Sequence, residues 1–224
     1  MRVIVLGATG SSGILVVKEY LKVYPTGTVV IYARNPSKVP ADIAASPAVT
    51  VVKGELTDAT VLTSAFEAGK VDAVLSTVGP TLGHPSTLPL TAAHKTIISV
   101  MAAQDCKRLI TLSTSSVEDP RDKFSLAAAI LVFIVWVIQR NAYNDIIAYS
   151  KLVEEECNKH GIDWTVVRVP NLNTKPNQKV IAGYLGDGKT GVFPSRHAIA
   201  EFYVREIEGK EWSCKAPALS STAK

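Results

Sequence analysis

The stretch that decides the fold is VIVLGATGSSG, residues 3–13. Four apolar residues, typical of a buried strand, run into a loop with three glycines, and a helix-like segment follows. In this context Gly7 permits a tight turn, Gly10 lets the backbone approach a pyrophosphate, and Gly13 lets the helix pack close to the strand. The free N–H groups at Ser11 and Ser12 would attract phosphates. The stretch therefore predicts a dinucleotide site, and the absence of a lysine after Gly13 excludes a mononucleotide P-loop.

The rest of the chain alternates between two patterns. Short runs rich in Val and Ile, typical of parallel strands buried on both faces, occur at 3–6, 28–32, 49–52, 73–76, 109–112 and 164–169. Helix-like segments occur at 11–24, 37–45, 59–68, 88–104, 143–160 and 198–207. This alternation predicts a doubly wound parallel sheet of the Rossmann-like α/β class, in a single domain over 1–224. Residues 171–191 look loop-like.

Composition excludes several classes of protein. The formal net charge of the 224 residues is only +4, and the basic residues are scattered, so we expect no nucleic-acid interface. The three cysteines, Cys106, Cys157 and Cys214, lie far apart without a Cys-x-x-Cys pair, which argues against disulfides and against a metal site. The apolar start is too short for a secretory signal. These features predict a cytoplasmic protein.

The end of the second predicted strand indicates which dinucleotide binds. An acidic residue there would hydrogen-bond the ribose 2′-hydroxyl of NAD, but the first acid after the strand is Asp42. Arg34 follows the strand instead, and its planar guanidinium suits a 2′-phosphate, while Lys38 could add a positive charge. The sequence therefore predicts a preference for NADP.

Several motifs together resemble a known family. They are GATGSSG at 7–13, YARNP at 32–36, KGELTD at 53–58, LSTVG at 75–79, LITLSTSS at 109–116, KLVEEECNKHGIDWTVVRVP at 151–170 and GKTGVFPSRHAIAEFYVREI at 188–207. The chain resembles the short-chain dehydrogenase/reductase superfamily, and within it the atypical, NmrA-like branch that includes flavin/biliverdin-IXβ reductases. The resemblance covers nearly the whole chain and is specific for fold and cofactor.

The resemblance implies a set of cofactor contacts at matching positions. They run from the glycine loop through the 2′-phosphate and adenine to the ribose: Gly7, Thr9, Gly10, Ser12, Gly13, Arg34, Glu55, Leu56, Thr77, Val78 and Gly79. Around the nicotinamide and its ribose they are Ser113, Lys151, Pro170, Asn171 and Leu172. In an open α/β sheet, ligands bind outside the carboxyl ends of the strands, where all of these residues are expected.

The catalytic residues match the family less well. Many members use a serine, here Ser115, and a tyrosine four residues before the helix lysine, here Lys151. Position 147 is Ile, and Tyr149 stands only two residues before the lysine, so the Tyr-x-x-x-Lys pair is absent. Hydride transfer to a carbonyl then needs another proton source. Asn171 and His84 are the polar alternatives, with an exposed loop position as the simpler interpretation of His84.

Residues 117–141 form an apolar insert between the fifth strand and the lysine helix. Its core, FSLAAAILVFIVWVI at 124–138, is shorter than the roughly 20 apolar residues that span a bilayer. We expect a helix that is buried or covered by a partner such as a second copy; a lipid-facing patch and a cover over an apolar pocket are the alternatives. The insert favours an apolar substrate or a dimer interface. Residues 171–224 are expected to form a C-terminal segment on the substrate side of the domain.

Three functions fit these features. The first is an NADPH-dependent reductase of a small apolar carbonyl, enone or aromatic compound. The second is a non-catalytic NADP-binding regulator, which the missing Tyr-x-x-x-Lys pair would suit. The third is an isomerase or cyclase that keeps the cofactor without net redox chemistry.

Overall fold

The computed structural model describes residues 1–176 and 178–223, and their strands form one sheet. The strands are β1 (Arg2–Leu6), β2 (Thr28–Ala33), β3 (Val49–Lys53), β4 (Ala73–Ser76), β5 (Arg108–Ser113), β6 (Asp163–Arg168), β7 (Gln178–Gly183) and β8 (Ala218–Ala223). The helices are α1 (Ser11–Val23), the 3₁₀ turn η1 (Pro36–Lys38), α2 (Ala41–Ala44), α3 (Ala59–Ser64), α4 (Pro89–Ala103), α5 (Leu126–Ile138), α6 (Arg140–His160) and α7 (Arg196–Gly209).

The strand order is β3-β2-β1-β4-β5-β6-β8-β7. Strands β1 to β6 pair in parallel through crossover connections, and β8 pairs in parallel with β6. Within the described residues, β7 and β8 form the antiparallel pair of the sheet. The chain winds outward from β1 in one direction through β2 and β3, and in the other through β4, β5 and β6. The point where the direction changes lies between β1 and β4, and ligands bind at this point in doubly wound sheets. The prediction of fold class is confirmed.

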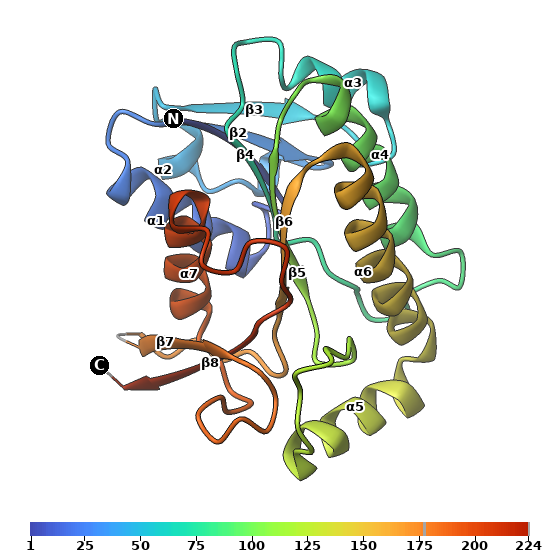
Figure 1. The fold of residues 1–224 in the computed structure, drawn as a ribbon. Helices are drawn as coiled ribbons and strands as arrows, with labels where there is room; N and C mark the ends of the chain where they lie inside the picture. Colours follow the sequence, from blue (N-terminus) through green and yellow to red (C-terminus); the bar gives the residue numbers. More distant parts are fainter. Residues whose placement is uncertain (177, 224) are drawn as a thin grey trace.

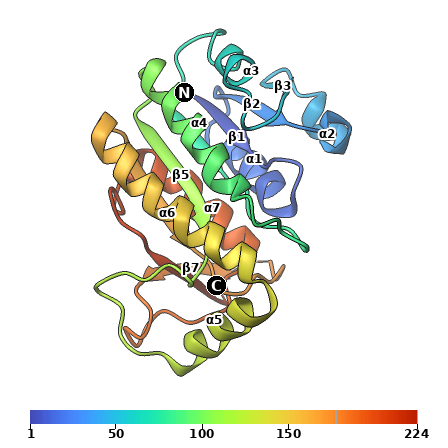
Figure 2. The ribbon, with the colours of Figure 1, turned by 90° about the vertical axis from the view of Figure 1, so that its right-hand side faces the viewer.

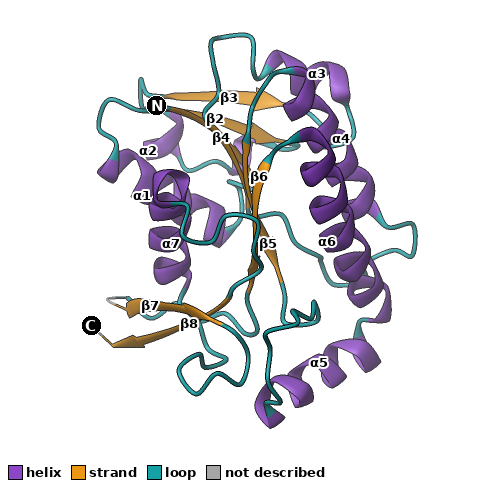
Figure 3. Ribbon diagram, viewed as in Figure 1, coloured by secondary structure: helices purple, strands orange, loops and turns teal. Residues whose placement is uncertain are grey.

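Helices cover both faces of the sheet (Figure 1, Figure 3). Helices α1 and α7 pack together over one face, and α4 and α6 pack together over the other, with α3 against α4. Figure 2 shows α4 and α6 crossing the sheet side by side. Two apolar clusters fill the spaces between the layers: one joins Val5 and Ile31 to Phe202, and the other joins Leu6 to Ile97 and Val153. Alternate side chains of each strand enter opposite clusters, as a sheet buried on both faces requires.

The prediction that 171–191 is a loop is wrong in part. Strand β7 lies within it and pairs with β8, 40 residues later, in a register that runs from Gln178 opposite Ala223 to Gly183 opposite Ala218. Neither strand has a long apolar run, since their sequences are QKVIAG and ALSSTA. Each is stabilised by pairing with the other, which local composition does not reveal.

The apolar segment 124–138 contains the expected helix, α5, but this helix is not buried within the chain. Only Ala128 of its 13 residues is buried. Figure 1 and Figure 2 both show α5 projecting from the body, beyond the end of β5. No single helix of the described residues is long and apolar enough to cross a membrane; α5 and α6 meet that test only jointly, and they are bent by 114° at their junction.

Candidate functional site

The glycine loop between β1 and α1 has the geometry of a phosphate site. Gly7 has φ +79°, and a Cβ there would lie 2.8 Å from Thr77 Oγ1. A Cβ on Gly13 would lie 2.4 Å from the carbonyl oxygen of Gly7, so α1 can pack this closely only with glycine there. A Cβ on Gly10 would meet only that same oxygen, at 3.4 Å, so one side of Gly10 is open. Gly10 caps α1 without a side chain, and no acid occupies the first turn, which leaves its N–H groups available to an anion.

A groove of about 620 Å³ starts at this loop and runs along the carboxyl ends of β1, β2 and β4. Its lining includes ten predicted cofactor residues: Gly7, Thr9, Gly10, Arg34, Lys38, Glu55, Leu56, Thr77, Val78 and Gly79. Arg34 extends into solvent, with its Nε 3.9 Å from a carboxylate oxygen of Glu55. The phenol of Tyr32 donates a hydrogen bond to the backbone carbonyl of Glu55, which fixes this end of the groove.

A second pocket, of about 320 Å³, continues from the groove, and Gly79 lines both cavities. Four residues predicted at the nicotinamide line it, namely Ser113, Pro170, Asn171 and Leu172. It also holds residues that the sequence did not indicate: Pro80, Leu112, Thr114, Tyr149, Val169 and Arg196. The groove and the pocket together have the shape of a dinucleotide site, with a compact compartment at the nicotinamide end.

Buried hydrogen bonds hold Tyr149 at the floor of this pocket. Its phenol donates to the backbone carbonyl of Leu112, and burial raises its pKa to about 12, so the phenol stays protonated at neutral pH. Its ring stacks on His94 with centroids 4.4 Å apart. Nδ1 of His94 donates to the carbonyl of Leu90 at 2.8 Å, so Nε2 accepts from the hydroxyl of Thr111 at 2.9 Å. Burial lowers the pKa of His94 to about 4, and the ring is therefore neutral.

His84, in the loop after β4, lines the groove and is held by a buried carboxylate. Its side chain is 6% exposed, so the interpretation of an exposed loop histidine is wrong. Nε2 lies 2.8 Å from Oδ2 of Asp145. Asp145 also accepts hydrogen bonds from the backbone N–H groups of Leu90 and Thr91 and from the hydroxyl of Thr91. Burial would raise the pKa of Asp145, but the hydrogen bonds from Thr91 and His84 outweigh it and lower that pKa.

Because Asp145 is ionised, Nε2 of His84 is the donor in this contact. Nδ1 makes no hydrogen bond within residues 1–176 and 178–223. His84 is thus an imidazole beside the groove with one nitrogen held in place by Asp145 and the other available.

The structure places two predicted catalytic residues elsewhere. Lys151 is on the solvent side of α6, 75% exposed, with its Nζ 3.7 Å from Glu155, and it lines a separate cavity of about 720 Å³ between α6 and β6. Tyr149, two positions earlier, faces the sheet, and two residues turn a helix by about 200°. Ser115 is buried, lines neither the groove nor the nicotinamide pocket, and its Oγ has no partner among the described residues. Ser12 also lies outside both linings, and Gly13 acts through packing.

Comparison with known proteins agrees with this geometry. The family model described as NAD(P)H-binding matches residues 7–210. The chain belongs to the NAD(P)H-binding family. The predicted NAD(P)-binding assignment is confirmed by this match, and the fold is shared with a short-chain dehydrogenase/reductase structure that is 15% identical to this chain. A search of curated proteins found no significant match.

Solved structures share the fold of this NAD(P)H-binding protein. A short-chain dehydrogenase/reductase from Veillonella parvula, in complex with NADP, is 14% identical with a TM-score of 0.76, over 98% of this chain and 94% of that one. ChuY, an anaerobillin reductase from Escherichia coli O157:H7, is 19% identical with a TM-score of 0.71, over 98% of this chain and 97% of that one. A Rossmann-fold NAD(P)-binding protein from Shigella flexneri is 17% identical with a TM-score of 0.72, over 100% and 96%.

Proposed function

We propose that the protein is an NADPH-dependent reductase of a small apolar carbonyl, enone or aromatic compound. The observation that carries the proposal is the continuity of the phosphate groove with the compact pocket through Gly79. Apolar side chains of Leu112, Val169 and Leu172 line this pocket, and the 320 Å³ volume suits a nicotinamide ring with a small substrate above it.

The preference for NADP rests on Arg34 and Lys38. Both line the groove beside Glu55 and follow β2, where no acid would bind a free ribose 2′-hydroxyl. A 2′-phosphate near Arg34 would form charge-assisted hydrogen bonds with its guanidinium. We expect NADPH to bind more tightly than NADH, and Arg34→Ala to remove most of that difference. Lys22→Ala, an exposed lysine paired with Glu19, is the matched control. Equal affinities of the unmodified protein for the two dinucleotides would refute the preference.

Reduction of a carbonyl needs a hydride on carbon and a proton on oxygen. NADPH, held by the glycine loop and by Arg34, would supply the hydride. We assign the proton to Nδ1 of His84 in its imidazolium form, in which the carboxylate of Asp145 holds Nε2–H and stabilises the cation, and water returns the proton to Nδ1 after the transfer. His84 and Gly79 line the same groove. Asn171 can hydrogen-bond the substrate but has no proton of suitable acidity to give.

The experiment is NADPH consumption at 340 nm over a panel of apolar aldehydes, ketones, enones and quinones, with product analysis. We expect His84→Gln to lower kcat on a carbonyl by about a hundredfold, the lower end for a lost general acid, with the affinity for NADPH retained. His197→Gln, an exposed histidine on α7, is the control. Product without loss of NADPH would indicate the isomerase or cyclase, and cofactor binding with neither would indicate the regulator; both results contradict the reductase.

A further inference from the structure

Helix α5 exposes a large apolar surface that the proposed reductase activity does not use. Its exposed apolar side chains, with those just before it, are Phe124, Leu126, Ile130, Phe133, Ile134, Trp136, Val137 and Ile138. Their exposed fractions range from 41% to 83%. Soluble proteins rarely leave a contiguous apolar surface of this kind open to water.

The exposed surface is too wide for one partner helix. At 100° per residue, the exposed positions of α5 cover an arc of about 200°, while its buried and half-buried positions cover about 100°. The inner stripe includes Ala128, which packs on Leu185 and Ala218. A second copy of the chain would cover a stripe about 100° wide and leave the rest in water. Lipid surrounds a helix on all of its outer sides, so the arc fits a lipid environment better than a dimer.

Charge and aromatic side chains also fit a lipid surface. Between Lys123 and Asn144 there is no acidic residue, and the charged residues are Lys123 and Arg140, one at each end of α5. The guanidinium of Arg140 lies 4.4 Å from the ring centroid of Trp136, and the Trp136 and Phe133 rings stack at 6.0 Å. Tryptophan is enriched where proteins meet the membrane–water interface, and basic side chains beside an apolar segment are attracted to anionic lipid headgroups.

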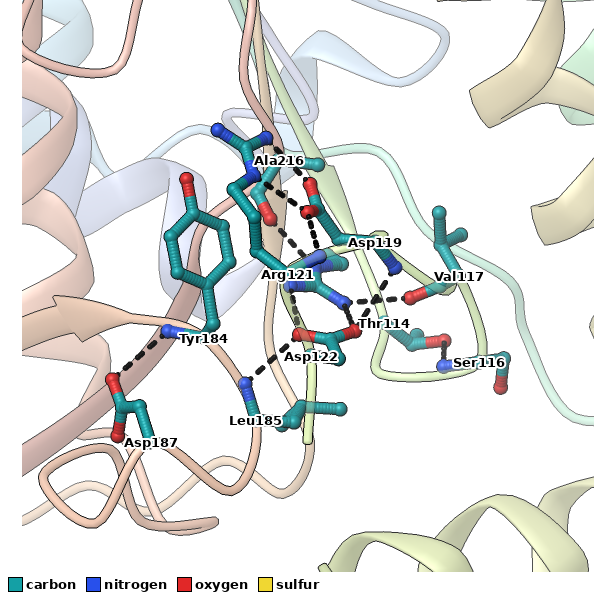
Figure 4. A network of polar contacts seen from close by, with 11 residues as sticks. Thr114, Ser116, Val117, Asp119, Arg121, Asp122, Tyr184, Leu185, Asp187 and Ala216 are labelled. Carbon is teal, nitrogen blue, oxygen red and sulfur yellow. Dashed lines mark hydrogen bonds and ion pairs between the residues drawn. The ribbon is translucent and has the colours of Figure 1, made fainter. Parts of the chain in front are cut away.

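A network of polar contacts holds the loop that precedes α5 (Figure 4). Arg168 is fully buried; its guanidinium donates to both carboxylate oxygens of Asp122, at 2.5 and 2.9 Å, and to the carbonyls of Val117 and Ala216. Asp122 in turn accepts a hydrogen bond from the backbone N–H of Leu185 at 2.9 Å. The loop that leads into α5 is thus fastened to β6 and to the segment before β8, so the helix projects as a fixed part of the fold.

We propose that α5 binds an anionic lipid surface and lies in its plane. A helix of 13 residues is about 20 Å long, short of the hydrocarbon core of about 30 Å, so α5 enters one leaflet without crossing. Strand β5 ends at Ser113 in the nicotinamide pocket, and the chain then leads to α5 at the same end of the molecule (Figure 1, Figure 2). Docking therefore brings the substrate end of the site toward the lipid.

The test is co-sedimentation of the full chain with vesicles of phosphatidylcholine, alone or mixed with phosphatidylserine. We expect binding to the mixed vesicles, and Phe133→Glu with Val137→Glu to weaken it about tenfold or more, since both side chains lie at the centre of the exposed arc. Val23→Glu, an exposed apolar residue at the end of α1, is the control with one added charge of the same kind. Lys123→Gln with Arg140→Gln should lower binding to the mixed vesicles toward that on phosphatidylcholine alone.

A second readout locates the contact. Lipids brominated on their acyl chains should quench the fluorescence of Trp136, and Trp136→Phe should remove this quenching while binding persists. Failure of the unmodified protein to bind either vesicle would overturn the proposal. So would a dimer in sedimentation velocity that Phe133→Glu with Val137→Glu dissociates, because the occupant would then be a second copy. Melting temperature with and without NADPH is measured for each variant, so a failure of cofactor binding is recognised separately.

Discussion

Acidification should destabilise this protein through one buried histidine, His94. The ring is fully buried between Leu90, Thr111 and Tyr149, and burial lowers its pKa from 6.5 to about 4, against smaller opposing effects of the Leu90 carbonyl and Asp145. Between these two pH values the unfolded chain binds a proton at His94 that the native protein does not bind. The contribution of the neutral ring to the free energy of unfolding is therefore fully present above pH 6.5 and is lost progressively as the pH falls toward 4.

The magnitude follows from the same two values. Each pKa unit corresponds to about 1.4 kcal/mol, so the native state should lose about 3 kcal/mol between pH 6.5 and 4 from this residue alone. That is a large fraction of the 5–15 kcal/mol, roughly, by which domains are usually stable. Other groups also take up protons on acidification, although Asp145, whose hydrogen bonds lower its pKa from the usual 3.8, does so below this range. The informative quantity is therefore the difference between the protein and a variant that lacks only the titrating ring.

Urea unfolding of the protein and of His94→Gln, at pH values from 7.5 to 4.5, measures this difference. Glutamine keeps a donor and an acceptor but does not titrate, so it should be less stable at pH 7.5 and lose less stability on acidification. His197→Gln replaces an exposed histidine and should follow the unmodified protein throughout. If the protein and His94→Gln lose stability in parallel, the imidazole is not a buried neutral group, and the reasoning fails.

Three further predictions concern the site. Gly13→Ala should abolish detectable NADPH binding in calorimetry and lower the melting temperature, because its Cβ would lie 2.4 Å from the Gly7 carbonyl oxygen; unchanged values would contradict the packing of α1. Lys151→Ala should leave NADPH affinity within about twofold, less than 0.5 kcal/mol, because this lysine is 75% exposed on the far side of α6; a large loss in titration would show that Lys151 does reach the cofactor. Asp145→Asn should cost about 1–3 kcal/mol in urea unfolding and lower kcat, since it leaves donors at Thr91 and Leu90 poorly satisfied. If Asp145→Asn were as stable and as active as the unmodified protein, the carboxylate would have no role in the site.

Local sequence was enough for the parts of the site that local geometry determines. The glycine loop could be predicted from the spacing of Gly7, Gly10 and Gly13 alone. The six parallel strands could be predicted from their short apolar runs. Arg34 could be predicted beside the groove because it directly follows a strand whose carboxyl end faces the ligand edge.

Contacts between distant segments could not be predicted in this way. His84 and Asp145 are 61 residues apart, and their hydrogen bond depends on how α4 and α6 pack. The family pattern suggested Lys151 at the ribose, but the helix turns Tyr149 and Asp145 inward instead, four residues apart on the same side. The sequence left open whether α5 is buried within the chain, covered by a partner or lipid-facing, because a run of apolar residues shows that a helix avoids water and does not show what covers it.

The hydrogen bonds of Asp145 also offer a way to follow motion near the site by amide hydrogen exchange. It joins α6, the first turn of α4 and the loop that carries His84, through hydrogen bonds to the amides of Leu90 and Thr91. Those two amide protons can exchange with solvent only when this junction opens, so their deuterium uptake records how often the loop and the two helices part. A ligand that reduces the motion of the loop should slow the exchange of both amide protons together. The measurement needs no label on the ligand.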